Sequence, residues 1–494
     1  MTVVEETRPR LALLASRACL LADRIAASGL FDCRIWTVAT APAVPLSLVE
    51  RVYRALDRRL FGVRRFGTAM AREGELLVDA LMTWRPDQVI CLVDPGSIAP
   101  ELLAMPGLVL RAEGMAGTES VAAVRAQLGQ SGGRVRLQWQ RMSVWGGGLV
   151  FEAACAIDHR SLQRSIEMVA FKCPMALLGA LRRLGEAAIS APAAVSTPIP
   201  RAPGKLAWRL LVDALCWPFV RSQWRLRLYR SAQPGRYLQP WKQLQPGPDR
   251  FWADPFVHRS TDGNLAVFFE DLPFATGRGH ISMLRVDEQG NASAPEAVIS
   301  EPWHLSYPFL LEFGNQLFMV PESSANRSVD LYVCDDYPLV WRKEMSLITG
   351  MRLADATFLH RDGRWWMFAA HGQDGASMFD ELVIFWALDL RGPWHGHAMN
   401  PVKIDARSSR PAGSFFESGG NLIRPVQDCS DSYGGAIRFN RVLRLDEQAF
   451  EEAELELLSL PDLAPGVPVH TYNSSRGVIC VDSLHRMAKR PRWC

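Results

Sequence analysis

The sequence lacks paired cysteines, a long apolar segment and a marked excess of charge of either sign. Its ten cysteines are scattered and none forms a CxxC pair. This spacing argues against a disulfide framework or a zinc site and favours reduced thiols in the cytoplasm. Lys and Arg number 55 against 52 for Asp and Glu, which leaves a net charge of +3. The overall charge therefore indicates neither a nucleic acid nor an acidic polymer as partner, and we expect no metal and no cofactor.

Signals for secretion or for membrane insertion are also missing. The N-terminus carries Glu5 and Glu6 before a short apolar run, which is too charged for a secretion signal. The best candidate for a membrane span, residues 206–220, is interrupted by Arg209 and Asp213. We therefore expect no transmembrane helix.

A hairpin pattern recurs throughout the second half of the chain. Each copy opens with a polar and aromatic cluster, continues as a short apolar run, turns near a glycine and returns as a second apolar run. The first copies recur at steps of about 50 residues, a period typical of propellers and solenoids. Five copies are present, and they open at Asp254, Tyr307, Asp355, Arg410 and His470. We predict an all-β five-bladed β-propeller over residues 233–494, whose first strands bring these five side chains to one axis.

Residues 1–188 have a different pattern and predict a separate domain. Apolar strands are expected at residues 10–16, 32–38 and 87–93, and helices at residues 18–28, within 46–81, and at 163–186, the last kinked or broken by Pro174. Alternation of strands and helices predicts an α/β, Rossmann-like domain with a parallel sheet and helices on both faces. Ligands of such domains bind beyond the carboxyl ends of the strands, here near residues 94–97 and 111–117.

This layout resembles the formyltransferase-like fold over residues 10–184. Members of that family use an Asn, a His and an Asp, whereas the matching strand end reads LRAEG at residues 110–114. Without the His and the Asn, formyl transfer lacks a general base and a donor to polarise the formyl group. We therefore expect a degenerate domain with a structural or ligand-docking role, in which His159 is structural.

The two domains are expected to be joined by residues 189–232. Ala, Pro, Ser and Thr dominate residues 189–204, which is typical of an extended linker. Residues 205–230 mix Trp and Leu with five arginines and predict a basic amphipathic helix. This helix would either pack against the propeller with a solvated Arg face or make peripheral contact with the inner face of an anionic membrane.

Several motifs of the repeat occur in an order that resembles a known family. They are ADPF, EPWHLSYPF, PES, ADAT followed by GRWWMF, SSRPAG, RPVQD with YGG, and HTYN. Over residues 241–482 they resemble the N-terminal domain of plant glucosamine inositolphosphorylceramide transferases and of bacterial relatives. That domain is similar in turn to the five-bladed propellers of arabinanase, invertase and levansucrase type glycoside hydrolases. The resemblance implies a carbohydrate-active site in glycan or glycolipid assembly.

The hydrolase propellers also imply roles for individual residues. They use a blade-one Asp as nucleophile or base, a blade-three Asp to support the transition state, and a blade-four Glu as acid. Asp254 and Asp355 match the first two positions, but Arg410 stands where the acid would be. Glu322 or Glu270 would have to replace it, in a pocket that raises the pKa of the carboxyl group. The predicted catalytic set is Asp254, Glu322 and Asp355.

We expect a sugar or a sugar-phosphate glycoconjugate as substrate. An arginine in place of the acid indicates a charged one, either a charged glycoconjugate or a nucleotide- or lipid-phosphate-linked sugar. The predicted substrate-binding residues are Glu270, His304, Tyr307, His371, Arg410, Arg424, Gln427, Asp428, His470 and Tyr472. His304 and His371 would either bind a ligand or order a loop. Three functions remain open: glycosyl transfer or glycosidic-bond chemistry at the axis, a non-catalytic glycan-binding propeller that docks a partner glycosyltransferase, and a formyl- or acyltransferase acting on a sugar.

Overall fold

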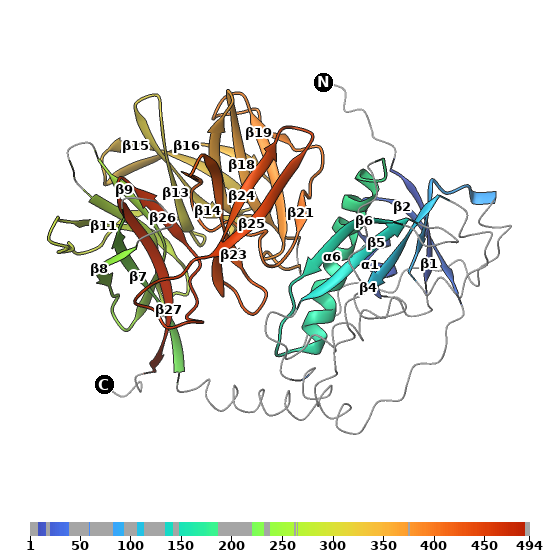
Figure 1. Cartoon of the computed structure of the whole chain (residues 1–494), viewed down its shortest axis with the longest axis horizontal. Coiled ribbons are helices and arrows are strands. Elements are labelled where there is room, and N and C mark those ends of the chain that lie inside the picture. Colours follow the sequence, from blue (N-terminus) through green and yellow to red (C-terminus); the bar gives the residue numbers. More distant parts are fainter. Residues whose placement is uncertain are drawn as a thin grey trace. The chain divides into compact units, whose positions relative to one another are not determined.

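The computed structural model describes most of the chain. The described residues are 8–15, 20–38, 59, 83–92, 106–112, 134–141, 148–185, 220–231, 238–260, 263, 265–373 and 376–489. The chain divides into two compact units, Met1–Leu211 with Asp374–Ser377, and Val212–Gln373 with Met378–Cys494 (Figure 1). In the part of the chain that the structure describes, no helix is both long and apolar enough to cross a bilayer.

The N-terminal unit contains a six-stranded mixed sheet. Its strands are β1 (Arg10–Ala15), β2 (Asp32–Thr37), β3 (Gln88–Cys91), β4 (Gly107–Ala112), β5 (Val135–Arg141) and β6 (Leu149–Cys155), in the order β2-β1-β3-β4-β5-β6. The first four are parallel, and β5 and β6 are antiparallel to their neighbours. The three predicted strands are therefore confirmed, but the sheet is mixed rather than wholly parallel. Similarity to formyltransferases stays a prediction.

Two helices of this unit, α1 (Leu20–Ala27) and α6 (Leu162–Arg182), contact each other and so cover the same face of the sheet. Gly29 follows α1 with a φ of 71°, as expected of a residue that closes a helix. The predicted break at Pro174 is wrong, because α6 runs through it. Pro174 is buried with its neighbours, so packing outweighs the lost backbone hydrogen bond. The predicted helix within residues 46–81, the ligand-binding loop at 94–97 and the linker at 189–204 lie outside the described residues, as does most of 111–117.

The second unit is a ring of five antiparallel sheets. Blade one is β9 (Arg250–Arg259), β10 (Leu265–Pro273), β11 (His280–Val286) and β12 (Glu296–Ile299). Blade two is β13 (Ser306–Phe313), β14 (Gln316–Ser323), β15 (Ser328–Asp336) and β16 (Val340–Thr349). Blade three is β17 (Leu353–Arg361), β18 (Arg364–His371), β19 (Glu381–Ala387) and β20 (His395–Gly396), with β21 (Lys403–Ile404) also paired to β19. Blade four is β22 (Phe416–Ser418), β23 (Asn421–Asp428), β24 (Ala436–Leu445) and β25 (Phe450–Leu457), and blade five is β26 (Tyr472–Ser475), β27 (Val478–Ala488), β7 (Val220–Arg230) and β8 (Gln239–Leu244).

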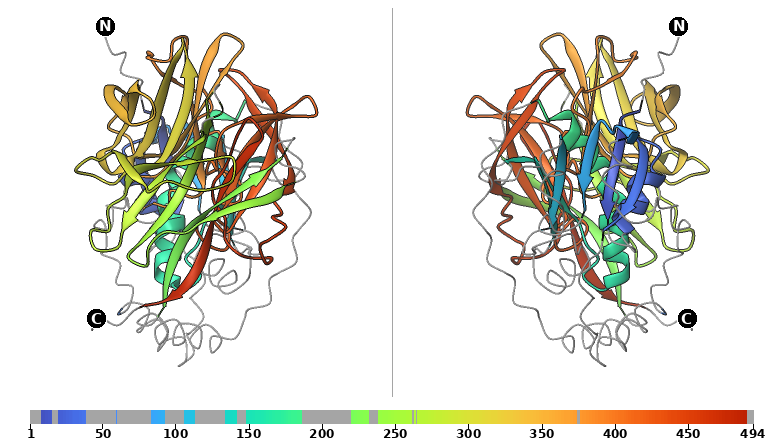
Figure 2. Two further views of the ribbon diagram at one scale, coloured as in Figure 1. Left: turned by 90° about the vertical axis from the view of Figure 1, so that its left-hand side faces the viewer. Right: turned by 90° about the vertical axis from the view of Figure 1, so that its right-hand side faces the viewer.

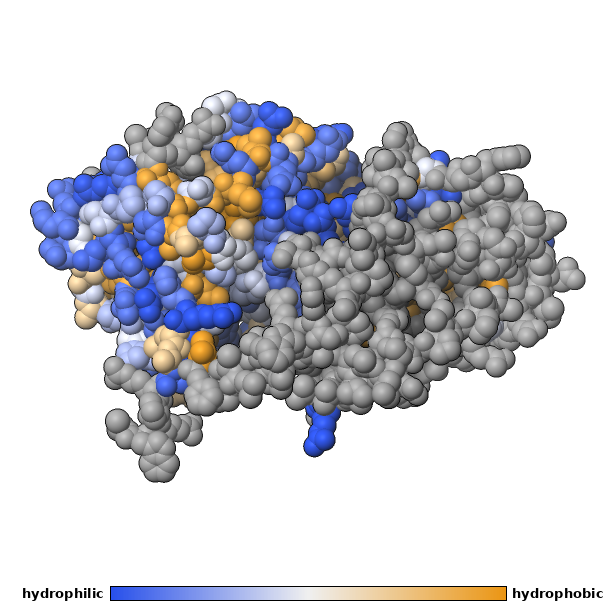
Figure 3. All heavy atoms as spheres, turned by 60° about the horizontal axis from the view of Figure 1, so that its bottom comes forward, coloured by the Kyte–Doolittle hydropathy of each residue, from blue (hydrophilic) through white to orange (hydrophobic). Residues whose placement is uncertain are grey.

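The blades follow one another around a common axis, with β9, β13, β17, β22 and β26 as the first strands (Figures 1 and 2). This arrangement confirms the predicted five-bladed propeller. Hydrophilic residues cover most of the described propeller face drawn in Figure 3, with apolar residues in narrower bands between them. Glu451–Glu456 lies in β25, and the side chain of Glu452 is buried there.

The ring is closed by strands from opposite ends of this unit. β7 pairs with β27 from Arg230 opposite Val478 to Val220 opposite Ala488. The predicted amphipathic helix over residues 205–230 is therefore wrong for 220–230, and the propeller begins at β7 rather than at residue 233. Trp224, Leu226 and Leu228 lie on one face of the strand and are buried, and Gln223, Arg227 and Tyr229 on the other face are buried as well. Residues 205–219 lie outside the described residues.

Candidate functional site

The first three blades each have a residue with a positive φ at the same position in the repeat. Asp254, Tyr307 and Asp355 have φ values of 50°, 41° and 53°, and each lies at or beside an irregularity in strand register. A positive φ is rare for residues other than glycine, and β-bulges redirect side chains next to functional sites. All three residues are buried. The predicted convergence of these repeat positions thus has a shared structural cause.

Asp254 forms the centre of one half of the site. Its Oδ1 lies 2.9 Å from Nε2 of His470 and accepts a hydrogen bond of 2.7 Å from the Thr471 hydroxyl. Its Oδ2 accepts a hydrogen bond from the backbone N–H of Tyr307 at 3.3 Å. Burial alone raises the pKa of Asp254, but the imidazolium of His470 and these hydrogen bonds hold it below its usual value. Asp254 is therefore an anion at neutral pH.

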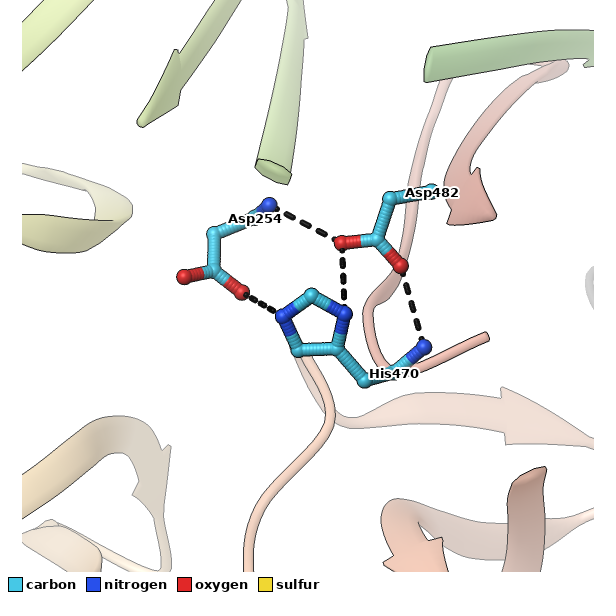
Figure 4. Close-up of side chains that lie close together, drawn as sticks. All are labelled: Asp254, His470 and Asp482. Atoms are coloured by element: carbon cyan, nitrogen blue, oxygen red, sulfur yellow. Dashed lines mark hydrogen bonds and ion pairs between the residues drawn. The ribbon is translucent and has the colours of Figure 1, made fainter. Parts of the chain in front are cut away.

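Asp482 supports this arrangement from the last blade (Figure 4). Its carboxylate accepts hydrogen bonds from the backbone N–H groups of Asp254 at 2.9 Å, His470 at 3.0 Å and Thr471 at 3.1 Å. It also lies 3.0 Å from Nδ1 of His470. Burial lowers the pKa of His470, but the carboxylates of Asp482 and Asp254 raise it well above its usual value. The ring is an imidazolium between two carboxylates.

The same three side chains are close enough to share a cation, since their ligand atoms lie within 4.8 Å of one another. The ring nitrogens of His470 already face the two carboxylates, however, and a metal needs a deprotonated imidazole nitrogen. The donor set therefore favours an ion-paired triad. Asp482 was missed in the sequence, although a carboxylate at the end of the apolar run VICV is a readable signal of a buried partner.

Asp355 forms the centre of the other half. Arg410 binds it in bidentate fashion, with Nε 2.6 Å from Oδ2 and Nη2 3.2 Å from Oδ1. Gln427 donates to Oδ2 at 2.8 Å, and Nη2 of Arg410 lies 3.6 Å from Glu322. Burial raises the pKa of Asp355 well above its usual value; Arg410 opposes this shift, and the carboxylates of Glu322 and Asp254 add to it. The structure thus brings together four residues predicted from sequence, namely Arg410, Asp355, Glu322 and Gln427.

These contacts define what Arg410 can still bind. The edge formed by Nε and Nη2 is occupied by Asp355, and Nη1 lies 3.4 Å from the carbonyl oxygen of Met378. A substrate anion would meet this arginine through Nη1 or through the second N–H of Nη2, which lies 3.6 Å from Glu322. Arg410 therefore acts first as a positioning residue for Asp355.

Glu270 and His304 lie beside Asp254. His304 Nε2 is 3.3 Å from the Glu270 carboxyl group, and its Nδ1 accepts a hydrogen bond from the Gly279 backbone N–H at 2.9 Å. That acceptor role assigns the ring proton of neutral His304 to Nε2, facing Glu270. Burial, and then the Asp254 carboxylate, raise the pKa of Glu270 well above its usual value. Only glycine fits at position 279, because a Cβ would lie 2.6 Å from the carbonyl oxygen of Leu305 and 2.8 Å from Glu270.

Two aromatic residues that the sequence analysis missed complete the site. The guanidinium of Arg410 lies 4.9 Å from the ring centroid of Tyr433 and 5.8 Å from that of Phe379. The two rings are 5.4 Å apart and both are partly exposed. Tyr433 also lies 5.2 Å from the ring of His470, so it spans both halves of the site. Aromatic faces beside a few fixed polar groups are typical of small-molecule sites.

Several predicted substrate-binding residues have other partners. Arg424 pairs with Glu452 at 2.7 Å and donates to the carbonyl oxygen of Ser408, because it lies three residues from Gln427 on β23 and so faces the opposite side of the sheet. Asp428 pairs with Arg438 at 2.7 Å. Tyr472 is fully buried in the core of blades four and five. The predicted role of these three residues in binding substrate is therefore corrected to a role in stabilising the propeller.

The structure gives no reason to reassign the other predicted binding residues. Tyr307 is buried, and its hydroxyl lies 2.7 Å from that of Thr357 beside the Asp355 half of the site. His371 Nδ1 lies 2.5 Å from Glu381, and a role in binding substrate stays a prediction. Glu417, which lies on β22 of blade four, is exposed.

Residues 243–464 match a family model described as the N-terminal region of glucosamine inositolphosphorylceramide transferase 1. The chain is 34% identical over 214 residues to glucosamine inositolphosphorylceramide transferase 1 of Oryza sativa subsp. japonica, covering 42% of this chain and 28% of that protein. It is 32% identical over 212 residues to the Arabidopsis thaliana protein of the same name, with the same shares covered. The chain thus spans 28% of the length of these relatives. The matched region contains Asp254, Glu270, Glu322, Asp355 and Arg410, but ends before His470.

Solved glycoside hydrolase structures are similar to the chain at low identity. An exo-β-1,3-galactanase from Phanerochaete chrysosporium with galactose aligns with a TM-score of 0.36 and 12% identity, over 47% of this chain and 58% of that one. A GH43_1 enzyme from Xanthomonas citri in complex with xylotriose aligns with a TM-score of 0.37 and 10% identity, over 49% and 85%. A family 117 glycoside hydrolase from Zobellia galactanivorans aligns with a TM-score of 0.35 and 12% identity, over 53% and 90%.

Proposed function

We propose that the propeller acts on a sugar-containing glycoconjugate in glycan or glycolipid assembly, at the carboxylate cluster on its axis. The name of the matched relatives supports a glycolipid substrate and glycosyl transfer, although that name belongs to proteins of which this chain matches 28%. The observation that carries the proposal is a buried pair of carboxyl groups with opposed environments. His470 keeps Asp254 anionic, while burial beside Asp254 raises the pKa of Glu270.

Opposed pKa values in one site assign an acid and a base. Asp254 is the nucleophile or general base in this proposal, and Glu270 is the general acid that protonates the leaving oxygen. His304 holds the Glu270 carboxyl group through Nε2. Glu322, the acid favoured from sequence, lies 3.6 Å from Arg410, and its Oε1 accepts a hydrogen bond from Ser324. We therefore assign Glu322 with Arg410 to the support of Asp355. The bidentate contact with Arg410 favours the charged form of Asp355, which stabilises positive charge that develops on the sugar ring.

The substrate would lie against Tyr433 and Phe379. Sugar rings present C–H groups that pack on aromatic faces, and the hydroxyl groups would meet the polar floor of the site. A transfer experiment tests the proposal: the purified chain is incubated with activated sugar donors and glycolipid acceptors, and product is measured for the native protein and for Glu270→Gln. Product formation that Glu270→Gln reduces by about a hundredfold or more supports the acid assignment. Equal rates would reject it.

A second function is favoured by one observation. Every carboxylate of the cluster already has a partner within the protein, as expected of a site that binds a glycan without turning it over. In this alternative the propeller is a glycan-binding module that docks a partner glycosyltransferase. Saturable glycan binding by the native chain, with no product from any donor, would select it. Formyl or acyl transfer by the N-terminal domain, cytoplasmic location and contact with the inner membrane face have no support in the described residues and stay predictions.

A further inference from the structure

We propose that the propeller carries a second binding site, for an organic phosphate, in a pocket between blades five and one. The pocket has a volume of about 580 Å³ and is lined by Arg230, Trp241, Arg259 and Arg476, with Gln239 and Gln289 beside them. This volume lies within the range of about 300–1,000 Å³ typical of small-molecule sites. We call these four residues, three arginines and a tryptophan, the arginine pocket. It is independent of the proposed function of the axial site.

The three arginines come from separate parts of the chain. Arg230 ends β7, Arg259 ends β9, and Arg476 lies in the turn between β26 and β27. Arg230 pairs with Val478 and with Gln239 in the sheet of blade five, which brings the turn of Arg476 next to it. Arg259 is five residues from Asp254 along β9, so the pocket lies roughly 16 Å from the axial carboxylates.

The positive charge of the pocket is only partly compensated. Arg259 lies 3.6 Å from Glu288, whose side chain is 77% exposed, and such solvated pairs contribute little. Asp287 and Glu288 also line the pocket, and Asp287 keeps its negative charge while it accepts hydrogen bonds from the backbone and side chain of Asn291. Among the described residues, none forms a hydrogen bond or an ion pair with the exposed guanidinium of Arg476. Three arginines against two carboxylates leave an excess of positive charge in one concavity, which favours an anionic occupant.

The orientation of Arg230 indicates what kind of anion fits. Its guanidinium carbon lies over the ring of Trp241, 4.3 Å from the centroid, and its Nη2 donates to the carbonyl oxygen of Glu288 at 2.7 Å. A guanidinium held in this way presents a fixed edge, which suits the oxygens of a phosphate group. Gln239 and Gln289 offer amide donors and acceptors for hydroxyl groups beside it. The chemistry therefore fits a phosphate carried by a polyol, either as a free sugar phosphate or as a lipid headgroup.

Binding of glucose 1-phosphate to the whole chain tests this inference, with uncharged glucose as the comparison and isothermal titration as the readout. The native protein should bind glucose 1-phosphate and not glucose, and added salt should weaken binding. Arg476→Asn should weaken it roughly tenfold or more, the loss expected for one charge-assisted hydrogen bond. Asparagine suits the test because it tolerates the φ of 43° at this position. Arg259→Gln should have a similar effect.

The matched control is Arg444→Gln, which removes the same charge from an exposed pair with Asp446 in blade four. It should leave binding unchanged. Vesicles of phosphatidylcholine with and without phosphatidylglycerol separate the two sources of phosphate. Binding to phosphatidylglycerol vesicles alone, lost in Arg476→Asn, supports the same site with a lipid headgroup as its occupant. Binding that survives in Arg476→Asn and Arg259→Gln, or that falls equally in Arg444→Gln, overturns the proposal, as does the absence of binding to both probes.

Discussion

The imidazole of His470 lies 2.9 Å from the carboxylate of Asp254, which joins the last blade of the propeller to the first. The same contact holds the proposed base in its charged form. One ion pair therefore both links the first and last blades of the propeller and favours the anionic form of Asp254.

Stability should depend on pH through this pair. The raised pKa of His470 contributes stability that is complete below about pH 6.5, the value of an unfolded histidine, and that declines as pH rises toward its folded value. The lowered pKa of Asp254 contributes stability that is present above about pH 4 and is lost on further acidification. Urea midpoints measured across this range should therefore fall in both directions, and in His470→Gln the slope above pH 6.5 should flatten. Identical pH profiles for the two proteins would contradict the imidazolium assignment.

Asp482→Asn should destabilise the protein, although Asp482 is not one of the residues predicted to contact substrate. The change leaves the buried imidazolium with one carboxylate fewer and places an amide near three backbone N–H donors, and breaking a buried pair in this way costs about 3–5 kcal/mol. The free energy of unfolding from urea titration measures the loss. Asp446→Asn, in an exposed pair with Arg444, is the control and should change stability by about 0.5 kcal/mol or less. A similar small change in both variants would show that Asp482 is not a structural anchor.

Arg424 should behave as a structural residue. Arg424 and Lys403 hold the pKa of the buried Glu452 at about 2, despite the opposing effect of burial. Arg424→Ala should lower the free energy of unfolding by about 3–5 kcal/mol, because it leaves Glu452 buried with Lys403 alone. The folded fraction should bind glycans with native affinity, which a glycan titration below the unfolding transition measures. A selective loss of affinity with unchanged stability would return Arg424 to the binding site.

Activity should fall as pH rises through the raised pKa of Glu270, because the proposed acid then loses its proton. His304→Gln removes the imidazole that holds the Glu270 carboxyl group, but it leaves the carboxyl group itself in place. The alkaline limb of the pH–rate profile should therefore shift in His304→Gln and disappear in Glu270→Gln. An alkaline limb that is the same in all three proteins would exclude Glu270 as the acid.

The sequence predicts the blades well because each hairpin is local. Its apolar runs and glycine turns are adjacent in the chain, and the repeat period places Asp254, Tyr307 and Asp355 at equivalent positions. The strand β7 escapes prediction because its partner β27 comes from the far end of the chain. Without that partner, the Trp, Leu and Arg content of residues 205–230 favours a basic amphipathic helix, although residues 224–228 alternate with the period of a strand.

Only those site residues that occupy equivalent positions in the repeat could be predicted from the sequence. Arg424 and Gln427 both look like polar residues near the axis, and only the two-residue period of β23 separates the structural one from the one that binds Asp355. Phe379 and Tyr433 lie outside the first strands of the blades and carry no repeat signal. Asp482 takes its meaning from contacts with Asp254 and His470, which the sequence alone does not place together.

The rate of product formation by Asp254→Asn tests the central claim most directly. The measurement uses activated sugar donors with a glycolipid acceptor and compares this variant with the native protein, each shown to be folded by its urea transition. Glu270→Gln leaves the ion pair of Asp254 with His470 intact. It therefore shows whether a loss of rate can arise without a loss of stability. The account predicts rates at least about a hundredfold below native in both variants, with glycan binding retained. Native rates in both variants would contradict it.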